Sequence, residues 1–377
     1  MRKGIFLSVI VLILSITLVF GVASITNAAE KKVSWRMGST WTPAINLYYG
    51  DKAMIRFVKE MTDGNFEIKW FPSGSLMKAF EYFDACSKGV VEAVGDWPSY
   101  WVSKDPAFDF LGSMPYGFTN LDYMIWIYQF GGLKYYQELY GKYGMTYFPV
   151  GVTPMESGFR TTEKTGPIRT IADYKGKKVR TPARATIWVL KKLGAAPIKM
   201  PGGEIYLAVE RGVLDGAEFS SPGIDWEMGF AEITKYWSVP CWFQPASLVG
   251  VMVNLKAFNA LPKTYKAIFK TACKAAAMEA LTFHEADAAR AIEKFKEKGT
   301  LIVKLDDESL RKLDELSGEY ILMAAKKSRE FARILKSQME YLVEYKDWRE
   351  MTGKFGFGHH PTYVEKVLKE LEKMGIE

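Results

Sequence analysis

The sequence contains little cysteine and little histidine, and these shortages exclude several kinds of site. Its three cysteines stand at unrelated spacings among apolar or small neighbours, which argues against a disulfide framework. Its three histidines have no third metal ligand close by in sequence, so a zinc site is not expected. The Gly-x-Ser-x-Gly motif is absent, and no cysteine–histidine arrangement indicates a nucleophile. The residues concerned are Cys86, Cys241, Cys273, His284, His359 and His360.

Long apolar runs are also scarce, and the one that stands out lies at the start of the chain. Arg2 and Lys3 precede a nearly uninterrupted apolar stretch over residues 5–20, which small residues follow before a charged segment. This three-part pattern is typical of a secretory signal peptide. A spanning helix needs about 20 apolar residues, so the run is short for one. We therefore expect residues 1–29 to be cleaved and the mature protein to be periplasmic; a retained N-terminal anchor is the alternative.

The sequence also lacks a strong excess of positive or negative charge. The formal net charge of +7 is small for 377 residues, and the basic residues form no concentrated stripe along the sequence. Nucleic-acid binding depends on such a stripe, so we expect no nucleic-acid partner. The apolar content is ample for sizeable cores, and the length suggests two domains.

Strand and helix patterns alternate from Val33 onward. The first unit is predicted to contain strands at Val33–Ser39, Phe66–Phe71 and residues 90–95 and helices at residues 41–62 and 76–87. A helical hairpin is predicted at residues 121–143. Further strands are predicted at residues 146–153, 196–200, 213–218 and 248–255. Further helices, the long final ones included, are predicted at residues 184–193, 205–211, 263–298, 307–348 and 362–374. Alternation with short connections implies parallel sheets covered on both faces.

This pattern predicts an α/β, two-lobe fold with a central sheet in each lobe, hinge strands and long C-terminal helices. We expect residues 30–154 to form the first part of lobe I and residues 155–247 to form lobe II. Residues 248–377 are expected to return to lobe I and to end in the long helices. No internal repeat or low-complexity segment interrupts this organisation.

The segment from residue 174 to residue 244 contains the residue on which the functional argument depends. Arg180 follows a short basic and apolar run and precedes Thr-Pro, which places it at the end of a strand. Its planar guanidinium suits a carboxylate held by two parallel hydrogen bonds. We expect this group to lie between the lobes without a partner from the protein; a surface ion pair with a protein carboxylate is the alternative.

Other polar and aromatic residues also follow predicted strands. Tyr100 and Trp101 come directly after the third strand, and ligands bind at the carboxyl ends of strands in open parallel sheets. They are expected to wall a pocket or to fill a domain interface. Glu156 and Arg160 follow the strand over residues 146–153. Glu156 and Glu218 would also be the working pair of a carboxylate-dependent hydrolase, which is a different class of protein.

Several motifs resemble the extracytoplasmic solute receptors of TRAP (tripartite ATP-independent periplasmic) transporters, in the DctP-like superfamily. The resemblance covers most of the chain after the leader. It is carried by Phe71-Pro72-Ser73-Gly74-Ser75-Leu76, Asp84, Gly89, Lys104-Asp105-Pro106, Pro115-Tyr116-Gly117, Gly176-Lys177-Lys178-Val179-Arg180 and Gly212-Val213-Leu214-Asp215-Gly216. The run Pro201-Gly202-Gly203-Glu204-Ile205-Tyr206, followed by Ala217-Glu218, is most similar to the 2-oxo-acid, or pyruvate-type, branch.

The resemblance implies a periplasmic-binding-protein-like fold and roles for particular residues. Arg180 would grip the carboxylate of the solute. A glutamate–tryptophan pair and a second glutamate help to hold a cation in the 2-oxo-acid branch, and this chain has Glu218-Phe219 and Gln244 at those places. One lost charge weakens a hard-cation site, although Glu156 could restore it. A bound sodium or calcium ion is therefore left open, with Glu218, Phe219 and Gln244 as its ligands.

The combined interpretation is a receptor, and not an enzyme, that closes over a small organic monocarboxylate and delivers it to the small and large membrane subunits of a TRAP transporter. The residues expected to contact the solute are Arg180, Glu218, Phe219, Gln244, Tyr100, Trp101, Glu156, Arg160 and Trp242. The aromatic ones favour a solute with an apolar body, such as a 2-oxo acid. A receptor that feeds a signalling sensor is a further alternative, and the sequence leaves monomer and homodimer open.

Overall fold

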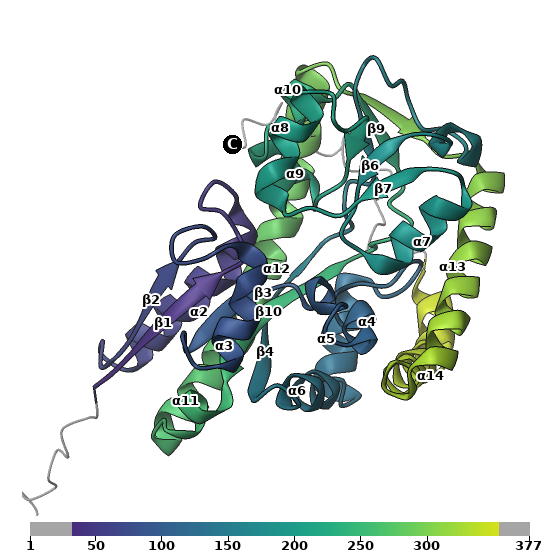
Figure 1. Ribbon diagram of the computed structural model, residues 1–377. Coiled ribbons are helices and arrows are strands. Elements are labelled where there is room, and N and C mark those ends of the chain that lie inside the picture. The colour runs from purple at the N-terminus through teal and green to yellow at the C-terminus, as the bar shows by residue number, and fades with distance from the viewer. Residues whose placement is uncertain (1–31, 354–377) are drawn as a thin grey trace, which may run out of the picture.

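The structure is a computed structural model that describes residues 32–353, and its chain forms two mixed β-sheets with helices packed around them (Figure 1). The predicted signal peptide over residues 1–29, the predicted helix over residues 362–374, and His359 and His360 lie outside the described residues. Within residues 32–353, no helix combines the length and the apolar character that crossing a bilayer would need.

The first sheet has five strands in the order β2-β1-β3-β10-β4. They are β1 (Val33–Ser39), β2 (Phe66–Phe71), β3 (Ala93–Asp96), β4 (Met145–Thr153) and β10 (Ser247–Asn254). The parallel arrangement predicted for the first three strands is confirmed, but the whole sheet is mixed because β10 runs antiparallel to β3 and β4. Alternation of strands and helices does not predict this pairing, since antiparallel neighbours need no helical crossover.

The second sheet has six strands in the order β11-β9-β5-β8-β6-β7. They are β5 (Arg160–Thr161), β6 (Lys178–Arg180), β7 (Ala196–Ile198), β8 (Gly216–Ala217), β9 (Tyr236–Val239) and β11 (Leu301–Lys304). The sequence analysis missed β5, β9 and β11, whose lengths of two to four residues are too short for a clear alternating pattern. The part of the chain from β10 onward therefore contributes to both sheets, with β10 in the first and β11 in the second.

Helices cover both sheets. They are α2 (Tyr49–Met61), α3 (Tyr82–Ser87), α4 (Asp109–Gly112), α5 (Asn120–Gln129), α6 (Leu133–Gly141), α7 (Arg184–Lys192), α8 (Ile205–Glu210), α9 (Pro222–Glu227), α10 (Phe230–Ile233), α11 (Leu255–Asn259), α12 (Lys263–Glu297), α13 (Asp307–Lys327) and α14 (Arg329–Thr352). The predicted hairpin is confirmed as α5 and α6, and Gly131 between them has a φ of +73° that favours glycine. The long helix predicted over residues 263–298 is confirmed as α12.

Two predicted helix boundaries were wrong for physical reasons. The helix expected from residue 41 begins at Tyr49, because Trp41 and Ile45 are instead buried in the core and hold their segment outside the helix. The helix expected over residues 307–348 is broken at Ser328, whose hydroxyl caps α14 by accepting a hydrogen bond from the Phe331 N–H at 3.2 Å.

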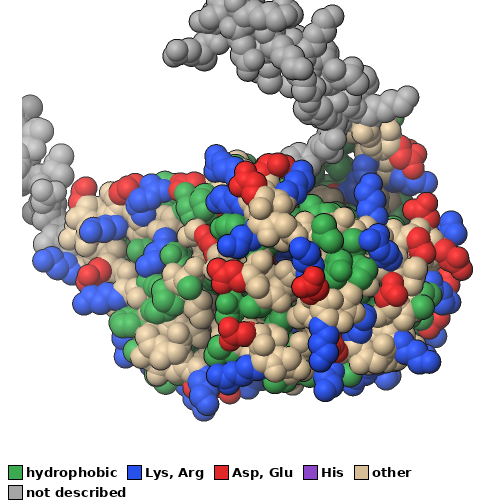
Figure 2. Space-filling view, turned by 90° about the horizontal axis from the view of Figure 1, so that it is seen from above, with side chains coloured by type: hydrophobic (Ala, Val, Ile, Leu, Met, Phe, Trp, Pro, Cys, Tyr) green, Lys and Arg blue, Asp and Glu red, His purple; other side chains and the backbone are tan. Residues whose placement is uncertain are grey.

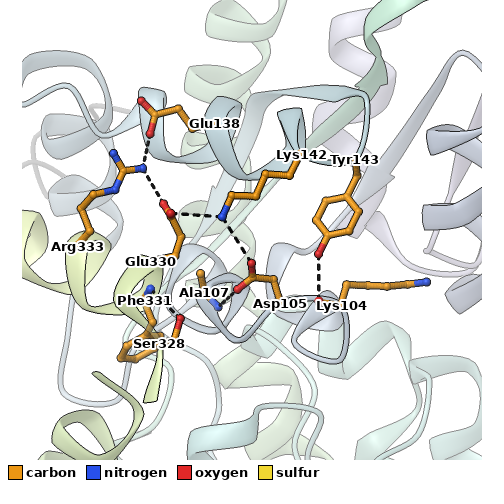
Figure 3. A network of polar contacts seen from close by, with 10 residues as sticks. All are labelled: Lys104, Asp105, Ala107, Glu138, Lys142, Tyr143, Ser328, Glu330, Phe331 and Arg333. Atoms are coloured by element: carbon orange, nitrogen blue, oxygen red, sulfur yellow. Dashed lines mark hydrogen bonds and ion pairs between the residues drawn. The ribbon is translucent and has the colours of Figure 1, made fainter. Parts of the chain in front are cut away.

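The long helices connect the two sheets. α12 packs against α2 and β4 of the first sheet and against α9 beside the second. α13 packs against α7. α14 follows α13 and lies on the side of the molecule away from α2 and β2 (Figure 1). Nζ of Lys142, the residue directly after α6, lies 3.3 Å from a carboxylate oxygen of Glu330 at the start of α14, and Arg333 pairs with both Glu330 and Glu138 (Figure 3). These ion pairs tie the start of α14 to α6.

Charges of both signs are mixed on the surface. In the face drawn in Figure 2, Lys and Arg side chains alternate with Asp and Glu side chains, and apolar side chains lie between them. This face has no single-sign field of the kind that draws nucleic acid to a protein.

Candidate functional site

A cavity lies between the two sheets, where the connections between them meet. The empty space along its wall, with open solvent included, is about 310 Å³. Segments that follow β1, β3, β4, β6 and β8 contribute to it, together with β10 and the residues before it. The lining residues are Trp41, Leu47, Trp97, Tyr100, Glu156, Arg180, Pro182, Phe219, Ser220, Gln244, Ser247 and Val249.

Arg180 lines this cavity from the last position of β6, and its side chain is completely buried. Its Nε and Nη2 atoms donate to the carbonyl of Met200 at 3.1 and 3.0 Å. Its Nη1 atom donates to the carbonyl of Glu218 at 2.9 Å and lies 3.3 Å from Oε1 of the same residue. The guanidinium is thus held rigidly at the cavity wall, with its carbon 5.3 Å from the centre of the Phe219 ring.

The expectation that the protein leaves Arg180 without an acidic partner was wrong. Glu218 follows β8, which pairs with β6, so the pairing of Arg180 with Ala217 in the sheet brings Glu218 beside the guanidinium. The ion pair is buried, and it lies within one sheet. Arg180 and Glu218 lie 38 residues apart in the sequence, so the sequence alone did not indicate that they are neighbours.

Glu156 and Gln244 also meet at the cavity wall. The Gln244 amide nitrogen donates to Oε1 of Glu156 at 3.0 Å, and the Ser247 hydroxyl donates to the same oxygen at 3.0 Å. Both residues lie in connections between the sheets, and the Glu156 N–H donates to the Gln244 carbonyl at 3.2 Å. The two connections therefore run side by side and bring a carboxylate and an amide to one place.

Buried oxygens without hydrogen-bond donors surround this place. By hydrogen-bond geometry, Oε2 of Glu156, Oε2 of Glu218 and Oε1 of Gln244 are buried and have no partner among residues 32–353, although the Glu218 carboxyl lies close to the side chains of Glu156 and Thr181. Buried polar atoms in native proteins are nearly always paired, so such a set indicates an absent ligand. Carboxylate and amide oxygens are ligands that sodium and calcium prefer, so the residues fit a hard cation. Within residues 32–353, no group of three His, Cys, Asp or Glu side chains could hold a metal, and Gln244 is not of those types.

The two glutamates also influence each other. Burial and the nearby charge of Glu218 raise the pKa of Glu156 well above its ordinary value. Burial raises the pKa of Glu218 to about 7, against the lowering effect of Arg180. Two carboxylates that share one arginine in a buried site lack enough positive charge, which is the electrostatic counterpart of the unpaired oxygens.

Aromatic rings form another part of the wall. Tyr100 and Phe219 were predicted and line the cavity, and so does Trp97, which stands in the aromatic run directly after the third strand. Trp41 was missed, although it also follows a strand of the parallel part of the first sheet, and position at a strand's carboxyl end is the signal that could have identified it. Trp41 packs against Tyr100, with ring centres 5.8 Å apart.

Four predicted site residues are not among the lining residues: Glu218, which pairs with Arg180, and three that lie away from the cavity. The indole of Trp101 donates to Asp96 and packs against Phe83, because neighbouring residues of a turn point in different directions. Trp242 lies in the core beside the second sheet. Arg160 is buried behind the cavity and pairs with Asp225 at 2.9 Å.

A second cavity adjoins the first. Its empty space, with open solvent included, is about 280 Å³, and it shares Trp41, Tyr100 and Phe219 with its neighbour. Among residues 32–353, no Asp, Glu, Lys, Arg or His lines it. The remaining lining residues are Thr40, Thr42, Ile45, Gly202, Gly203 and Met228. Phe219 is seated between the cavities by Gly202, since a Cβ atom at residue 202 would lie 2.2 Å from its ring.

Residues 37–327 match the family model of bacterial extracellular solute-binding proteins, family 7. The chain belongs to this family. A monocarboxylate 2-oxoacid-binding periplasmic protein of Nostoc sp. is 31% identical over 328 residues, which cover 87% of this chain and 89% of that protein. The family resemblance identified from the motifs, including its nearness to the 2-oxo-acid branch, is confirmed.

Solved structures agree with the sequence relatives. A TRAP solute-binding protein from Pseudoalteromonas atlantica, with bound sodium and pyruvate, matches with a TM-score of 0.81 and 30% identity over 86% of this chain and 98% of that chain. One from Bordetella bronchiseptica, a dimer with calcium and picolinate in one of its sites, also gives 0.81, with 28% identity and coverages of 92% and 99%. The α/β two-lobe fold is therefore that of TRAP solute-binding proteins.

Membership of the family decides the broad class of function. Solute-binding proteins of TRAP transporters are extracytoplasmic receptors that bind small organic acids and work with membrane permeases. The family and the fold are those of receptors and not of enzymes, so the hydrolase considered from the sequence does not apply.

Proposed function

We propose that this solute-binding protein captures a small organic monocarboxylate, a 2-oxo acid or a related acid, and delivers it to the membrane permease of a TRAP transporter. The observation that carries the proposal is one cavity lined by Arg180, Glu156 and Gln244, in which each of the last two has a buried oxygen without a partner among residues 32–353. Glu218 pairs with Arg180 and adds a third such oxygen next to the lining residue Phe219. Relatives that hold pyruvate together with sodium or calcium support it.

In this proposal Arg180 grips the carboxylate of the solute. Two of its nitrogens are anchored on the Met200 carbonyl, so the guanidinium plane is oriented before the solute arrives. The 3.3 Å contact with the Glu218 side chain is the longest of its hydrogen bonds, and the solute carboxylate would replace it with a charge-assisted bond of the same kind and of shorter, more favourable length. Removal from water on binding strengthens that bond further.

The same proposal includes a cation between the solute and the acidic residues. Glu156, Glu218 and Gln244 would supply side-chain oxygens, and Phe219 can supply only its main-chain carbonyl, since its ring carries no ligand atom. When bound, the ion would neutralise the carboxylates and attract the oxygens of the solute. Two glutamates and one solute carboxylate carry three negative charges, and Arg180 carries one positive charge. A calcium ion would balance this set, whereas sodium would leave one negative charge.

We further propose that two lobes close over the solute. Lobe I would comprise residues 30–154 and part of residues 248–377, and lobe II would comprise residues 155–247, after removal of residues 1–29. Glu156 and Gln244 lie in the connections between the sheets, so a ligand that joins them to Arg180 would stabilise the closed form over an open one. The closed form would then be presented to the permease by a monomer or a homodimer.

Two measurements on the full chain test this function. Mass spectrometry of the acid that co-purifies, together with elemental analysis, should find a monocarboxylate and about one sodium or calcium per chain. Calorimetry with pyruvate in calcium chloride should show one saturable site, and a chelator should weaken it. Tighter binding of succinate than of any monocarboxylate would overturn the proposal.

A further inference from the structure

Arg160 forms a network behind the cavity that joins the segments carrying the proposed ligands. Its side chain is completely buried, and its guanidinium carbon lies 4.0 Å from the Trp237 ring centre and 3.9 Å from that of Phe295. Nε donates to Oδ2 of Asp225 at 2.9 Å, and Nη2 donates to the hydroxyl of Ser157 at 3.0 Å. Two aromatic faces and two acceptors leave the guanidinium little freedom.

The partners of Arg160 are themselves joined. Oδ1 of Asp225 accepts the main-chain N–H of Ser220 at 3.0 Å. The Ser157 N–H donates to the Ser220 carbonyl at 2.9 Å, and the Ser157 carbonyl accepts from the indole of Trp237. Through these bonds one buried ion pair fixes the main chain on both sides, at Ser157 and at Ser220.

The positions next to these serines carry the proposed site. Ser157 follows Glu156, and Ser220 follows Glu218-Phe219 and lines the cavity itself. Glu156 and Glu218 come from different connections, so their separation depends on how these two segments are held. Gly158 adds a constraint, because it has a φ of +81° and a Cβ atom there would lie 2.4 Å from the Ser238 carbonyl.

We propose that Arg160 is a positioning residue: with Asp225 it sets the spacing between Glu156 and Glu218-Phe219, without touching the solute. The solute named in this inference is the one given by the proposed function, on which the inference rests in that respect. It replaces the earlier expectation that Arg160 contacts the solute. Lysine cannot substitute, because only the planar fork of arginine reaches Asp225 and Ser157 while it stacks between two rings.

A paired apolar replacement separates positioning from stability. Replacing a buried ion pair by apolar residues is often neutral or stabilising, whereas removal of one partner is not. Arg160→Met/Asp225→Leu should therefore unfold within about 5 °C of the wild type, yet bind pyruvate in calcium chloride at least tenfold more weakly. Near-wild-type unfolding together with a dissociation constant within threefold of the wild type would overturn the proposal.

A double-mutant cycle covers the case in which that variant does not fold. Ser157→Ala keeps the ion pair and removes one hydroxyl, and Arg160→Lys removes the bond to that hydroxyl. Each should weaken pyruvate binding about threefold or more, and the double variant should bind no more weakly than Arg160→Lys. If the binding free energies lost in the two single variants simply add in the double variant, the proposal is contradicted. Arg333→Met, which breaks a distant ion-pair network (Figure 3), should leave the dissociation constant within twofold.

Amide hydrogen exchange gives a readout that needs no ligand. In either Arg160 variant, segments 155–158 and 218–221 should exchange at least tenfold faster, while β11 in the same sheet keeps its wild-type rate. Unchanged exchange in the two segments, or equal acceleration of all three, would refute positioning. A wild-type protein that binds no pyruvate would count against the proposed function alone, because this comparison still decides the role of Arg160.

Discussion

Nη1 of Arg180, a residue of the cavity wall, lies 3.3 Å from Oε1 of Glu218, and both side chains are buried. An arginine with a built-in acidic partner differs from one that waits unpaired for a solute. Oε2 of the same glutamate has no partner, so the carboxylate is only half satisfied. The pair therefore holds the arginine in place while it leaves one oxygen free for something else.

Loss of the guanidinium should abolish solute capture. Truncating one partner of a buried, hydrogen-bonded charge pair typically costs about 2–5 kcal/mol, so Arg180→Met should weaken pyruvate binding by about 30-fold or more in calorimetry. Arg184 lies four residues further on and is exposed, which makes Arg184→Met the matched control. An Arg180→Met protein that melts cooperatively and binds pyruvate like the control would contradict the assignment.

Exchange of a charge between two neighbours should preserve cation binding. The Gln244 amide nitrogen lies 3.0 Å from Oε1 of Glu156, so a carboxylate at either position reaches the same place. Glu156→Gln should weaken calcium-dependent pyruvate binding at least tenfold, because hard-cation affinity follows ligand charge. Glu156→Gln/Gln244→Glu should recover most of that loss. Equal weakness of the single and double variants in calcium titrations would show that charge count does not govern the site.

The sequence was informative about this site where its signal was local. Arg180, Glu218, Phe219 and Gln244 stand in motifs, and Tyr100 follows a strand, so their positions could be predicted. The ion pair of Arg180 with Glu218 could not, because it depends on which short strands become neighbours in the second sheet. Pairing partners of two- and three-residue strands are set by tertiary packing, which leaves no pattern in the residues themselves.

The direction in which a side chain points is the other property of the site that could not be predicted from the sequence. Tyr100 and Trp101 are adjacent, yet one lines the cavity and the other donates to Asp96 in the core. Arg160 illustrates the same limit, because position after β4 was interpreted as proximity to the solute. Rotation along a short turn or strand reverses which face a residue presents, so positions one residue apart differ completely in role.

Acid should destabilise the protein through His284. Burial lowers the pKa of this histidine to about 4, and neither ring nitrogen has a hydrogen-bond partner. In the unfolded chain its pKa is about 6.5. The unfolded state therefore binds the extra proton between these values, and stability falls as pH decreases from about 6.5 to 4. At about 1.4 kcal/mol per pKa unit, the loss amounts to roughly 3 kcal/mol.

Replacement of this histidine provides the check. His284→Phe fills the same aromatic environment beside Phe283, whose ring centre lies 5.3 Å away, and it cannot titrate. Chemical denaturation at pH 7.5 and pH 4.5 should show a smaller pH-dependent loss in the variant by about 2 kcal/mol or more. The same loss in both proteins would assign the acid sensitivity to other groups.

Acids with longer apolar chains should bind more tightly than pyruvate. The second cavity has about 280 Å³ of empty space, open solvent included, and shares Phe219 with the first, and no charged side chain of residues 32–353 lines it. Each methylene that leaves water for such a space gains about 0.8 kcal/mol, or about fourfold in affinity. Calorimetry with pyruvate, 2-oxobutanoate and 2-oxopentanoate should therefore show stepwise tightening. Met228→Trp reduces the second cavity. This variant should lower the ratio of the affinity for 2-oxopentanoate to the affinity for pyruvate at least fivefold. If the three acids bind equally and the variant leaves their ratio unchanged, the second cavity lies outside the solute's reach, and Phe219 closes the site around pyruvate-sized acids.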